Sequence, residues 1–549
     1  MTAVDNSAGE VDMDNDFLWW RDGVIYQIYP RSFVDSNADG IGDLQGIRSK
    51  LDYLQGLGID AIWLSPIFPS PDVDFGYDVS NYLDIDPKFG TLEEFQQLVE
   101  DCHQRGIRVI LDLVLNHTSD QHPWFVESRS SRDNPKNDWY LWKDPSPNGG
   151  PPNNWQSVFG GSGWEYEARR GQYYFHMFYK EQPDVNWRNP AVREELVNVF
   201  RFWAERGVDG FRLDVFNDYF KDAGFRDNPA KLGLRPFDRQ QHIHDVSQPE
   251  MMPLLKEIRS VLDSYPQRYA VGETFLGEDQ AKTAASYCGS ERLHAAFNFS
   301  FTHCKWDAGQ FLRAIQHWEN SLGDDAWPTY VLNNHDVRRS ASRYARGEDD
   351  RRLKVAAAML LTLRGTPYLY YGEEIGMRDI KVGRSEIQDP IGKHYWPFFI
   401  GRDGCRSPMQ WNAAKHAGFS QATPWLKVNP NHATRNVESQ QNDPRSLYHF
   451  YRNLIQLRKD LPALRQGMFL PLVHEPRYIL AYLRQTQTQT VLVALNFSRR
   501  RLPLMLSGRM ITGQPWKLAL SSREDARAEL SGTRLDLAPY EASIYAVNE

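Results

Sequence analysis

Eight short apolar runs, rich in Val, Ile, Tyr and Phe, alternate along this 549-residue chain with longer amphipathic segments. Continuously apolar strands separated by helices are typical of parallel βα units in which both faces of the sheet are covered. Eight such units predict an α/β fold with a (β/α)8 TIM barrel, and a doubly wound open sheet is the alternative. The expected strands lie at residues 23–30, 61–66, 108–117, 210–216, 268–274, 295–301, 329–336 and 367–374.

Two stretches depart from this alternation. The one after the third expected strand is rich in Pro, Gly, Asn, Asp and Trp, and it predicts a small inserted domain on the face that bears the βα loops. Beyond residue 468, short alternating runs predict an antiparallel β-sandwich. We therefore expect a disordered lead-in (1–17), a barrel (18–117 and 189–467), an inserted domain (118–188) and a C-terminal β domain (468–549).

Composition narrows the class of protein. With 41% hydrophobic and 24% charged residues, the chain is expected to be globular with a large core. A net charge of −8 argues against binding nucleic acid. The four cysteines form no metal-binding spacing, and so few of them favour a reduced, cytoplasmic setting. We expect neither a signal peptide, because the N-terminus is acidic and polar, nor a membrane span, because no run of about 18 apolar residues occurs.

A cation and an anion stand two residues apart within one expected strand, in "GFRLDVFND" (210–218). Arg212 and Asp214 would point to the same side of the sheet, yet charged side chains are seldom buried without partners. A structural ion pair and a functional pair both fit this stretch. Polar residues also end the neighbouring strands, namely Asp112, Asn116 and His117 on the third, Glu273 on the fifth, and His335 and Asp336 on the seventh.

Active sites of (β/α)8 barrels lie at the C-terminal ends of the strands, so these polar residues are expected to converge on one rim. The sequence has no nucleophile elbow, P-loop or H-E-x-x-H zinc motif, which leaves carboxylates as the candidate reactive groups. One ionised and one protonated carboxyl group flanking a bond suit glycoside hydrolysis. Beside Arg212, Asp214 is expected to keep a low pKa, whereas a Glu held away from cations can stay protonated and donate to a leaving oxygen.

Four stretches, "DLVLNH", "GFRLDVFN", "GET" and "NNHD", resemble in content and order the signature motifs of the α-amylase family of glycoside hydrolases (family thirteen). The resemblance covers about residues 18–549 and is greatest to the oligo-1,6-glucosidase and α-glucosidase branch. The stretches "WWRDGVIYQIYPRSF" and "GRDGCRSPMQW" also look like this branch.

The resemblance implies a retaining mechanism without an organic cofactor. Asp214 would be the nucleophile, Glu273 the general acid and then the general base, and Asp336 the third carboxylate, which grips the sugar hydroxyls. Arg212 would keep Asp214 ionised, and Asp112 would support the rim.

The resemblance also implies a set of substrate-binding residues. Tyr77, in "DFGYDVSNY", would stack on the sugar, while Asp74 would pair with Arg402 and close the pocket floor, which makes the action exo. The alternative is that Asp74 and Arg402 are surface turn residues. The remaining sugar-binding candidates are His117, His335, Val215, Phe159 and Gln182, and packing within the inserted domain is an equal alternative for Phe159.

The loop "DSNADGIGD" (35–43) begins like an EF-hand, but the Glu expected at its twelfth position is absent, because Gly46 stands there. Oxygen ligands crowded on a tight loop still suit Ca²⁺. The corresponding loop of oligo-1,6-glucosidases is a structural Ca²⁺ or Mg²⁺ site. That resemblance implies the ligands Asp35, Asn37, Asp39, the Ile41 carbonyl and Asp43, and a metal-free Asx-rich turn is the alternative.

The expected activity is therefore that of an α-glucosidase that releases glucose from short α-glucosides such as isomaltose or maltose, with transglucosylation as a second outcome. Val215, next to the nucleophile, goes with α-1,6 preference in this branch, whereas residues 217–249 resemble α-glucosidases of broader or α-1,4 preference. Trehalose synthase and sucrose-acting glucosyltransferase activities are the alternatives, and a non-catalytic transporter subunit is a remote one. The expected partners are small α-glucosides, and the chain would be a monomer or a homodimer.

Overall fold

The computed structural model describes residues 17–277, 279–472, 477–506 and 515–548. Residues 1–16 of the predicted lead-in lie outside the described residues. No helix in the described part of the chain has both the length and the apolar composition needed to cross a membrane.

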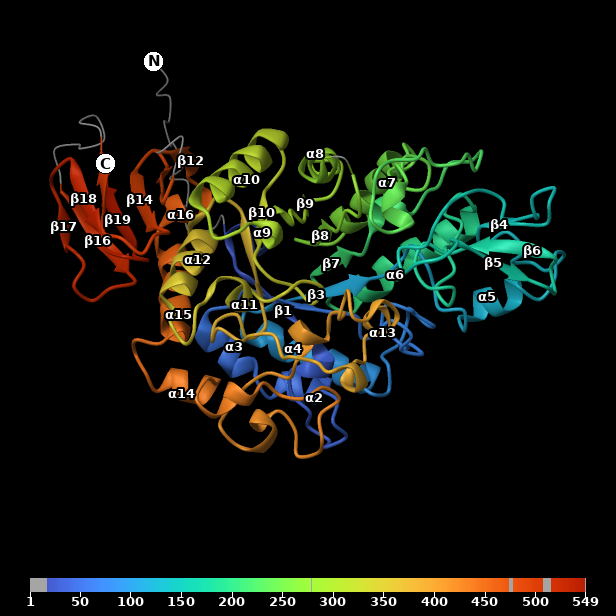
Figure 1. Cartoon of the computed structure of the whole chain (residues 1–549), viewed down its shortest axis with the longest axis horizontal. Helices are drawn as coiled ribbons and strands as arrows, with labels where there is room; N and C mark the ends of the chain where they lie inside the picture. Colours follow the sequence, from blue (N-terminus) through green and yellow to red (C-terminus); the bar gives the residue numbers. More distant parts are fainter. Residues whose placement is uncertain (1–16, 278, 473–476, 507–514, 549) are drawn as a thin grey trace, which may run out of the picture.

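Eight parallel strands form the centre of the molecule and confirm the predicted barrel (Figure 1). They follow one another in the order β10-β11-β1-β2-β3-β7-β8-β9. Within the described residues the two strands at the ends of this order, β9 and β10, are not paired, so the barrel is nearly closed. The strands are β1 (Ile25–Ile28), β2 (Ala61–Leu64), β3 (Arg108–Leu113), β7 (Gly210–Leu213), β8 (Tyr269–Gly272), β9 (Ala295–Ala296), β10 (Thr329–Val331) and β11 (Thr366–Tyr370).

The observed strands are shorter than the predicted runs, and β9 is the extreme case. The run 295–301 was predicted to be one strand, but only its first two residues pair. The side-chain oxygen of Asn298 accepts hydrogen bonds from the backbone N–H and the hydroxyl of Ser300, at 3.0 and 2.6 Å. Such a local Asx turn competes with strand pairing, and α9 (Ser300–His303) begins there.

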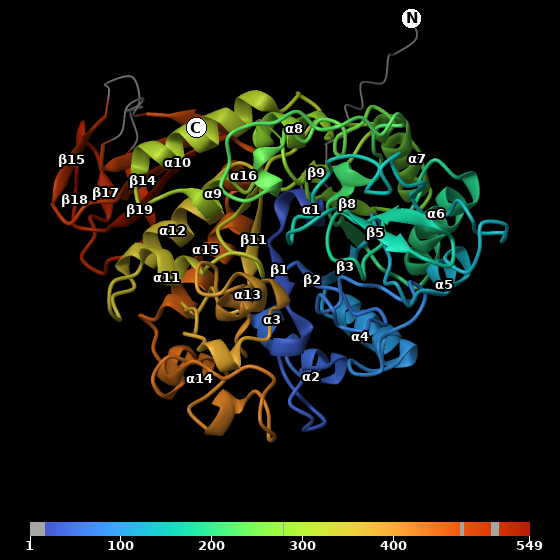
Figure 2. The same ribbon diagram turned by 45° about the vertical axis from the view of Figure 1, so that its right-hand side comes forward.

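Helices surround the barrel strands (Figure 2). α4 (Leu92–Gln104) illustrates why the sequence forms them: Thr91 and Glu94 make a capping box, and Phe95, Leu98, Val99 and Cys102 form one buried face. The other longer helices are α6 (Pro190–Glu205), α7 (Met251–Asp263), α10 (Ala308–Ser321), α12 (Arg351–Thr362) and α15 (Leu447–Asp460). The shorter ones are α1 (Trp19–Asp22), α2 (Leu44–Arg48), α3 (Leu51–Leu57), α5 (Pro123–Ser128), α8 (Gln280–Ser286), α11 (Ser340–Tyr344), α13 (Pro390–Tyr395), α14 (Val437–Gln441) and α16 (Pro462–Gln466).

Between β3 and β7 the chain forms a small antiparallel sheet in the order β4-β6-β5, at the right of Figure 1. Its strands are β4 (Trp142–Lys143), β5 (Trp164–Glu167) and β6 (Gln172–Phe175). A single bridge from His117 to Asp184 ties this segment to the stretch that follows β3, and a bridge from Tyr140 to Val185 joins two parts of the segment itself. The inserted segment therefore lies at the strand ends that carry the predicted site residues.

The C-terminal region confirms the predicted antiparallel β domain. In one strand of this domain, alternate side chains face two different cores. Leu480 and Tyr482 join the core shared with the barrel helices, whereas Ala481 and Leu483 face a separate core. The domain therefore has two layers. A six-stranded sheet, in the order β12-β13-β14-β19-β16-β17, accompanies a two-stranded sheet, β15-β18. The strands are β12 (Met468–Pro471), β13 (Ile479–Gln485), β14 (Gln489–Asn496), β15 (Leu502–Met505), β16 (Trp516–Ser521), β17 (Glu529–Leu530), β18 (Arg534–Leu537) and β19 (Ala542–Asn548).

Candidate active site

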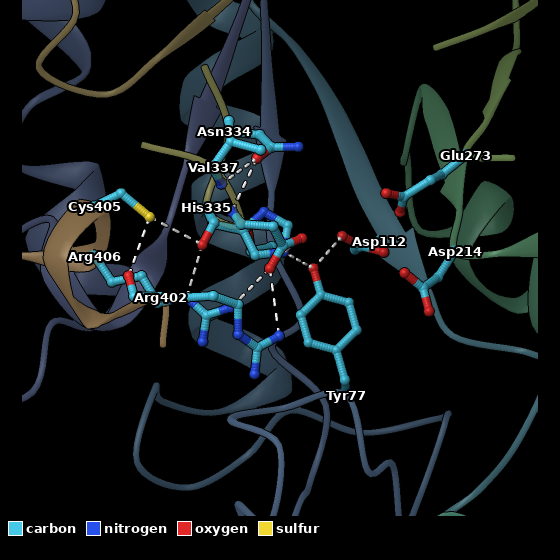
Figure 3. Close-up of polar contacts among 12 residues, drawn as sticks. Tyr77, Asp112, Asp214, Glu273, Asn334, His335, Val337, Arg402, Cys405 and Arg406 are labelled. Atoms are coloured by element: carbon cyan, nitrogen blue, oxygen red, sulfur yellow. Dashed lines mark hydrogen bonds and ion pairs between the residues drawn. The ribbon is translucent and has the colours of Figure 1, made fainter. Parts of the chain in front are cut away.

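The ends of the parallel strands bring the predicted carboxylates to one rim. Backbone pairing continues just beyond the strands: the Asp214 N–H donates to the carbonyl of Leu113 at 3.0 Å, and the Glu273 N–H donates to the carbonyl of Leu213 at 2.9 Å. Figure 3 shows Asp112, Asp214, Glu273 and the group around His335 facing one another across this rim. The convergence expected from the barrel geometry is therefore observed.

A cavity of about 270 Å³ opens at this rim. It is lined by ten of the predicted catalytic and substrate-binding residues, namely Asp74, Tyr77, His117, Phe159, Gln182, Asp214, Val215, Glu273, Asp336 and Arg402. The other two, Arg212 and His335, lie behind this lining and contact Asp214 and Asp336. Four larger cavities have volumes of about 430, 540, 660 and 710 Å³, and the 710 Å³ cavity shares Asp336, Phe399 and Arg402 with this one. Of these five, only the 270 Å³ cavity is lined by both Asp214 and Glu273.

Sequence reasoning missed five apolar residues of the lining, which are Val158, Phe178, Phe275, Ile391 and Phe399. Phe275 follows Glu273 closely in "GETF", so its place after a catalytic strand was a usable signal. Phe399 comes from a loop before Arg402, and nothing local in "WPFFI" indicates that it reaches the cavity. These side chains add an apolar part to a lining that otherwise consists largely of polar residues.

The Arg212 guanidinium is the centre of the carboxylate cluster. It is 1% exposed, and its Nη1 lies 2.7 Å from Asp112 and 2.6 Å from Asp214, while Nη2 pairs with Glu273. The question raised by "GFRLDVFND" is thus answered, because the cation and the anion are buried together at the strand end. A glutamate held away from cations was expected from the sequence. Glu273 contradicts this expectation, since Arg212 lies between the carboxylates of Asp214 and Glu273.

The predicted low pKa of Asp214 is also wrong. Burial raises its pKa to about 6, since the opposing attraction of Arg212 is offset further by the negative charge of Asp112. Burial raises the pKa of Asp112 to about 6 in the same way, against the attraction of Arg212. The two carboxyl groups share one guanidinium and therefore titrate as a pair.

Asp336 lies in the opposite electrostatic environment. Burial would raise its pKa, but interactions with His335, Arg402 and Arg406 outweigh burial and hold the pKa below its usual range. The contacts are 3.1 Å to His335, 3.4 Å to Arg402 and 2.9 Å to Arg406. Because burial also lowers the pKa of His335 to about 3, the ring is neutral at pH 7, and the two guanidinium groups are the charges that keep Asp336 ionised.

Arg402 lines the cavity and pairs with two buried carboxylates. It lies 2.7 Å from Asp74 and 2.9 Å from Asp389, which sequence reasoning did not find. Asp74 is 5% exposed, and this burial disagrees with the alternative prediction that Asp74 is a surface turn residue. Burial raises the pKa of Asp74 even though Arg402 lowers it.

Tyr77, His117 and Gln182 form one polar wall. The His117 Nε2 lies 2.9 Å from the Tyr77 carbonyl, to which Gln182 also donates at 3.2 Å. Burial lowers the pKa of His117. Phe159 packs against Phe178 and Tyr179, at 5.6 and 4.1 Å between ring centroids, and also lines the cavity, so its two predicted roles coincide.

The loop 35–43 offers the predicted oxygen ligands but uses them internally. The Asp35 carboxylate accepts from the backbone N–H groups of Ala38 and Gly40, both at 2.8 Å, and from the Ser420 hydroxyl at 2.5 Å. Asp43 caps α2 through the Gly46 N–H and accepts from Ser36. In the described part of the chain, no group of three or more His, Cys, Asp or Glu side chains is arranged to hold a metal ion. The oxygen-rich loop fits a hard cation only through additional Asn and carbonyl ligands.

The fold and the site together define a carbohydrate-cleaving enzyme of the barrel type, and comparisons with known proteins specify the family. Residues 27–467 match the alpha amylase catalytic domain, so the chain belongs to the α-amylase family and is a glycoside hydrolase.

Known relatives span nearly the whole chain. It is 46% identical to the probable alpha-glucosidase of Rhizobium meliloti (strain 1021), over 91% of this chain and 92% of that protein. It is 39% identical to the oligo-1,6-glucosidase of Parageobacillus thermoglucosidasius, over 96% and 99%.

Among solved structures, the alpha-glucosyl transfer enzyme XgtA matches with a TM-score of 0.91 and 42% identity, over 96% of this chain and 99% of that chain. The trehalulose synthase MutB from Pseudomonas mesoacidophila MX-45 matches with a TM-score of 0.87 and 34% identity, over 96% and 99%.

Proposed function

We propose that the protein is a retaining, exo-acting α-glucosidase that releases glucose from the non-reducing end of short α-glucosides. The observation that carries this proposal is the pair of carboxylates, Asp214 and Glu273, on one buried guanidinium at the wall of a small closed cavity. At about 270 Å³ the cavity is slightly smaller than the roughly 300–1,000 Å³ of sites for drug-sized ligands, which suits one sugar ring.

Each carboxylate has a separate task in this proposal. Asp214 attacks the anomeric carbon and forms a covalent ester, while Glu273 protonates the leaving oxygen and later takes a proton from the water that cleaves the ester. Two inversions at one carbon retain the α configuration. Asp336, kept ionised by Arg402 and Arg406, accepts hydrogen bonds from sugar hydroxyls as the ring distorts.

The floor supports exo action. Arg402 is held by Asp74 and Asp389, and we propose that this ion-pair cluster closes the inner end of the cavity, so that a chain of sugars enters by its non-reducing end only.

A substrate panel tests this proposal. We expect the purified protein to release glucose from isomaltose, maltose or both, and Asp214→Asn to lower kcat by about 10³-fold or more, since it removes the nucleophile. The exposed Asp324→Asn is the matched control and should leave the rate unchanged. Full activity in Asp214→Asn would refute the assignment, and an inactive wild-type protein on all α-glucosides would refute the function.

The pKa of Asp214 sets an acid limit on activity. The nucleophile must be ionised, and its pKa is raised to about 6. We therefore expect kcat/KM to fall about tenfold per pH unit below about pH 6. Asp112→Asn removes the neighbouring negative charge, so the acid limb should move to lower pH. A limb that stays in place in Asp112→Asn would contradict the coupling of the two groups.

Val215 supports a proposal on linkage. It lines the cavity directly after Asp214, where a β-branched side chain would crowd the leaving sugar of maltose, so we propose α-1,6 preference. Val215→Ala removes the branch, so it should raise the kcat/KM ratio of maltose to isomaltose by about tenfold, because a methyl-sized change is worth ~1–3 kcal/mol in a pocket. Val158→Ala, elsewhere on the lining, should affect both substrates alike. An unchanged ratio in Val215→Ala would remove this residue from the argument.

A sucrose-isomerising transferase is the second candidate function, because the trehalulose synthase MutB matches over 96% of the chain. The same carboxylates would form the same glucosyl ester, and the acceptor would be fructose or another sugar in place of water. Products from sucrose separate the two: free glucose and fructose favour hydrolysis, and an isomeric disaccharide favours transfer. Trehalose formed from maltose would favour the trehalose synthase alternative in the same way.

The loop 35–43 is proposed to bind Ca²⁺, or Mg²⁺, with a structural role, through Asp35, Asn37, Asp39, Asp43 and the Ile41 carbonyl. None of these residues lines the cavity. We expect chelation to lower the Tm and added Ca²⁺ to restore it, because a ligand at 100 times its Kd stabilises the folded state by about 2.7 kcal/mol. Asp39→Ala, at an exposed loop position, should abolish the Ca²⁺ response while preserving kcat. A Tm unaffected by chelation would favour the metal-free Asx turn.

A further inference from the structure

The ring of His335 is enclosed by aromatic side chains. It is 1% exposed and lies between Tyr77, with ring centroids 5.4 Å apart, and Tyr29, with centroids 6.0 Å apart. Trp63 meets its edge at 6.2 Å. Because the ring is so confined, its hydrogen bonds are set by the few polar atoms at its two nitrogens.

The carboxylate beside Nε2 favours a proton on that nitrogen. The Asp336 Oδ2 lies 3.1 Å away, and an ionised carboxylate can only accept a hydrogen bond. The Tyr77 hydroxyl lies 2.6 Å from the same nitrogen and 3.3 Å from Asp112, to which it can donate its own proton. The Nε2–H therefore has acceptors, and Tyr77 keeps a donor role toward Asp112 (Figure 3).

The other nitrogen of the ring faces the end of β1. The amide Nε2 of Gln27, a residue that is 1% exposed, lies 2.8 Å from Nδ1 of His335 and 3.2 Å from the hydroxyl of Ser65. An amide nitrogen has no lone pair to offer, so Nδ1 must be the acceptor. The opposite amide orientation would set the amide oxygen against Nδ1 and so require the proton on Nδ1, which would leave a bare Nε2 facing the Asp336 carboxylate.

We propose that Gln27 is a positioning residue that holds His335 in the neutral tautomer with its proton on Nε2. Burial, together with Arg406, Arg212 and Arg402, lowers the pKa of His335 to about 3 against the attraction of Asp336. The ring is therefore neutral, and its single N–H proton lies on one of the two nitrogens. Gln27 decides which nitrogen carries it.

The tautomer matters for Asp336. With its proton on Nε2, His335 turns the positive end of an N–H toward Asp336 without adding a charge, so Arg402 and Arg406 stay the only full charges that contact this carboxylate among the described residues. With the proton on Nδ1, a lone pair would face Asp336 and displace it. The kinetic consequence rests on the proposed glucosidase function, whereas the tautomer itself does not.

Nitrogen NMR of ¹⁵N-histidine-labelled protein tests the tautomer without substrate. The His335 signals are assigned by their loss in His335→Asn. In the wild type at pH 7, we expect Nδ1 to resonate as an unprotonated nitrogen and Nε2 as a protonated one. A protonated Nδ1 in the wild type would overturn the proposal, whatever the activity of the protein.

Two substitutions test the role of Gln27 itself. Gln27→Met removes the donor, so we expect both tautomers of His335 and a drop of about tenfold or more in kcat/KM for glucose release. Gln27→Glu supplies a carboxylate that accepts from Nδ1, so both nitrogens should carry protons at pH 6 and a new ionisation should appear in the pH profile. Unchanged spectra in both variants would show that Gln27 does not set the tautomer.

Gln410→Met is the matched control. Gln410 is also fully buried, and its amide donates to Asn431 at 3.0 Å. We expect a loss of Tm similar to that of Gln27→Met, with kcat/KM and the His335 signals unchanged. An equal kinetic loss in Gln410→Met would assign the effect of Gln27 to stability alone. If Gln27→Met fails to fold, the wild-type and Gln27→Glu spectra still decide the outcome.

Discussion

The site depends on one guanidinium group buried among carboxylates that come from three strand ends. Arg212 contacts Asp112, Asp214 and Glu273 while 1% exposed. Taking each ion out of water costs several kcal/mol, and a buried pair regains this cost only when its geometry is good. Three acceptors on one cation leave a net negative charge at the rim. An arrangement this costly is poorly explained by stability, and it is well explained by a reaction that develops positive charge at a sugar carbon.

The other contacts of the site give its carboxylates different electrostatic environments and therefore different pKa values. Asp214 has one cation to share and a second carboxylate beside it, so its pKa rises to about 6. Asp336 contacts two guanidinium groups, of which Arg402 is shared with Asp74 and Asp389, and it stays ionised. Carboxylates pushed apart in this way can take different roles at one pH. In the proposed mechanism, the carboxylate that reacts is thereby less stable as an anion than the carboxylate that only binds.

The sequence predicted the strands and the rim for a clear physical reason. Apolar runs alternating with amphipathic segments can bury both faces of a sheet only in parallel βα units, and parallel strands share one C-terminal end. Arg212, Glu273 and Asp336 could thus be grouped without coordinates. Asp389, which accepts from Arg402, and Phe399, which lines the cavity, could not, because they come from the segment after β11, whose path depends on tertiary packing. The pKa of Asp214 was wrongly predicted because proximity to Arg212 can be read from a sequence, whereas burial to 7% exposure cannot.

Val215 shows how the backbone serves the site. Successive side chains of a strand point to opposite faces, so a continued strand could not place both Asp214 and Val215 on one cavity. Both do line it, and the backbone of Val215 accordingly turns to φ 34°, in the left-handed region. That conformation is a genuine outlier for a β-branched residue and costs of order 1–3 kcal/mol, which the surrounding core must offset. The apolar side chain beside Asp214 on the cavity wall is therefore a consequence of ending β7 at this point, and it is the position through which the proposed linkage preference would act.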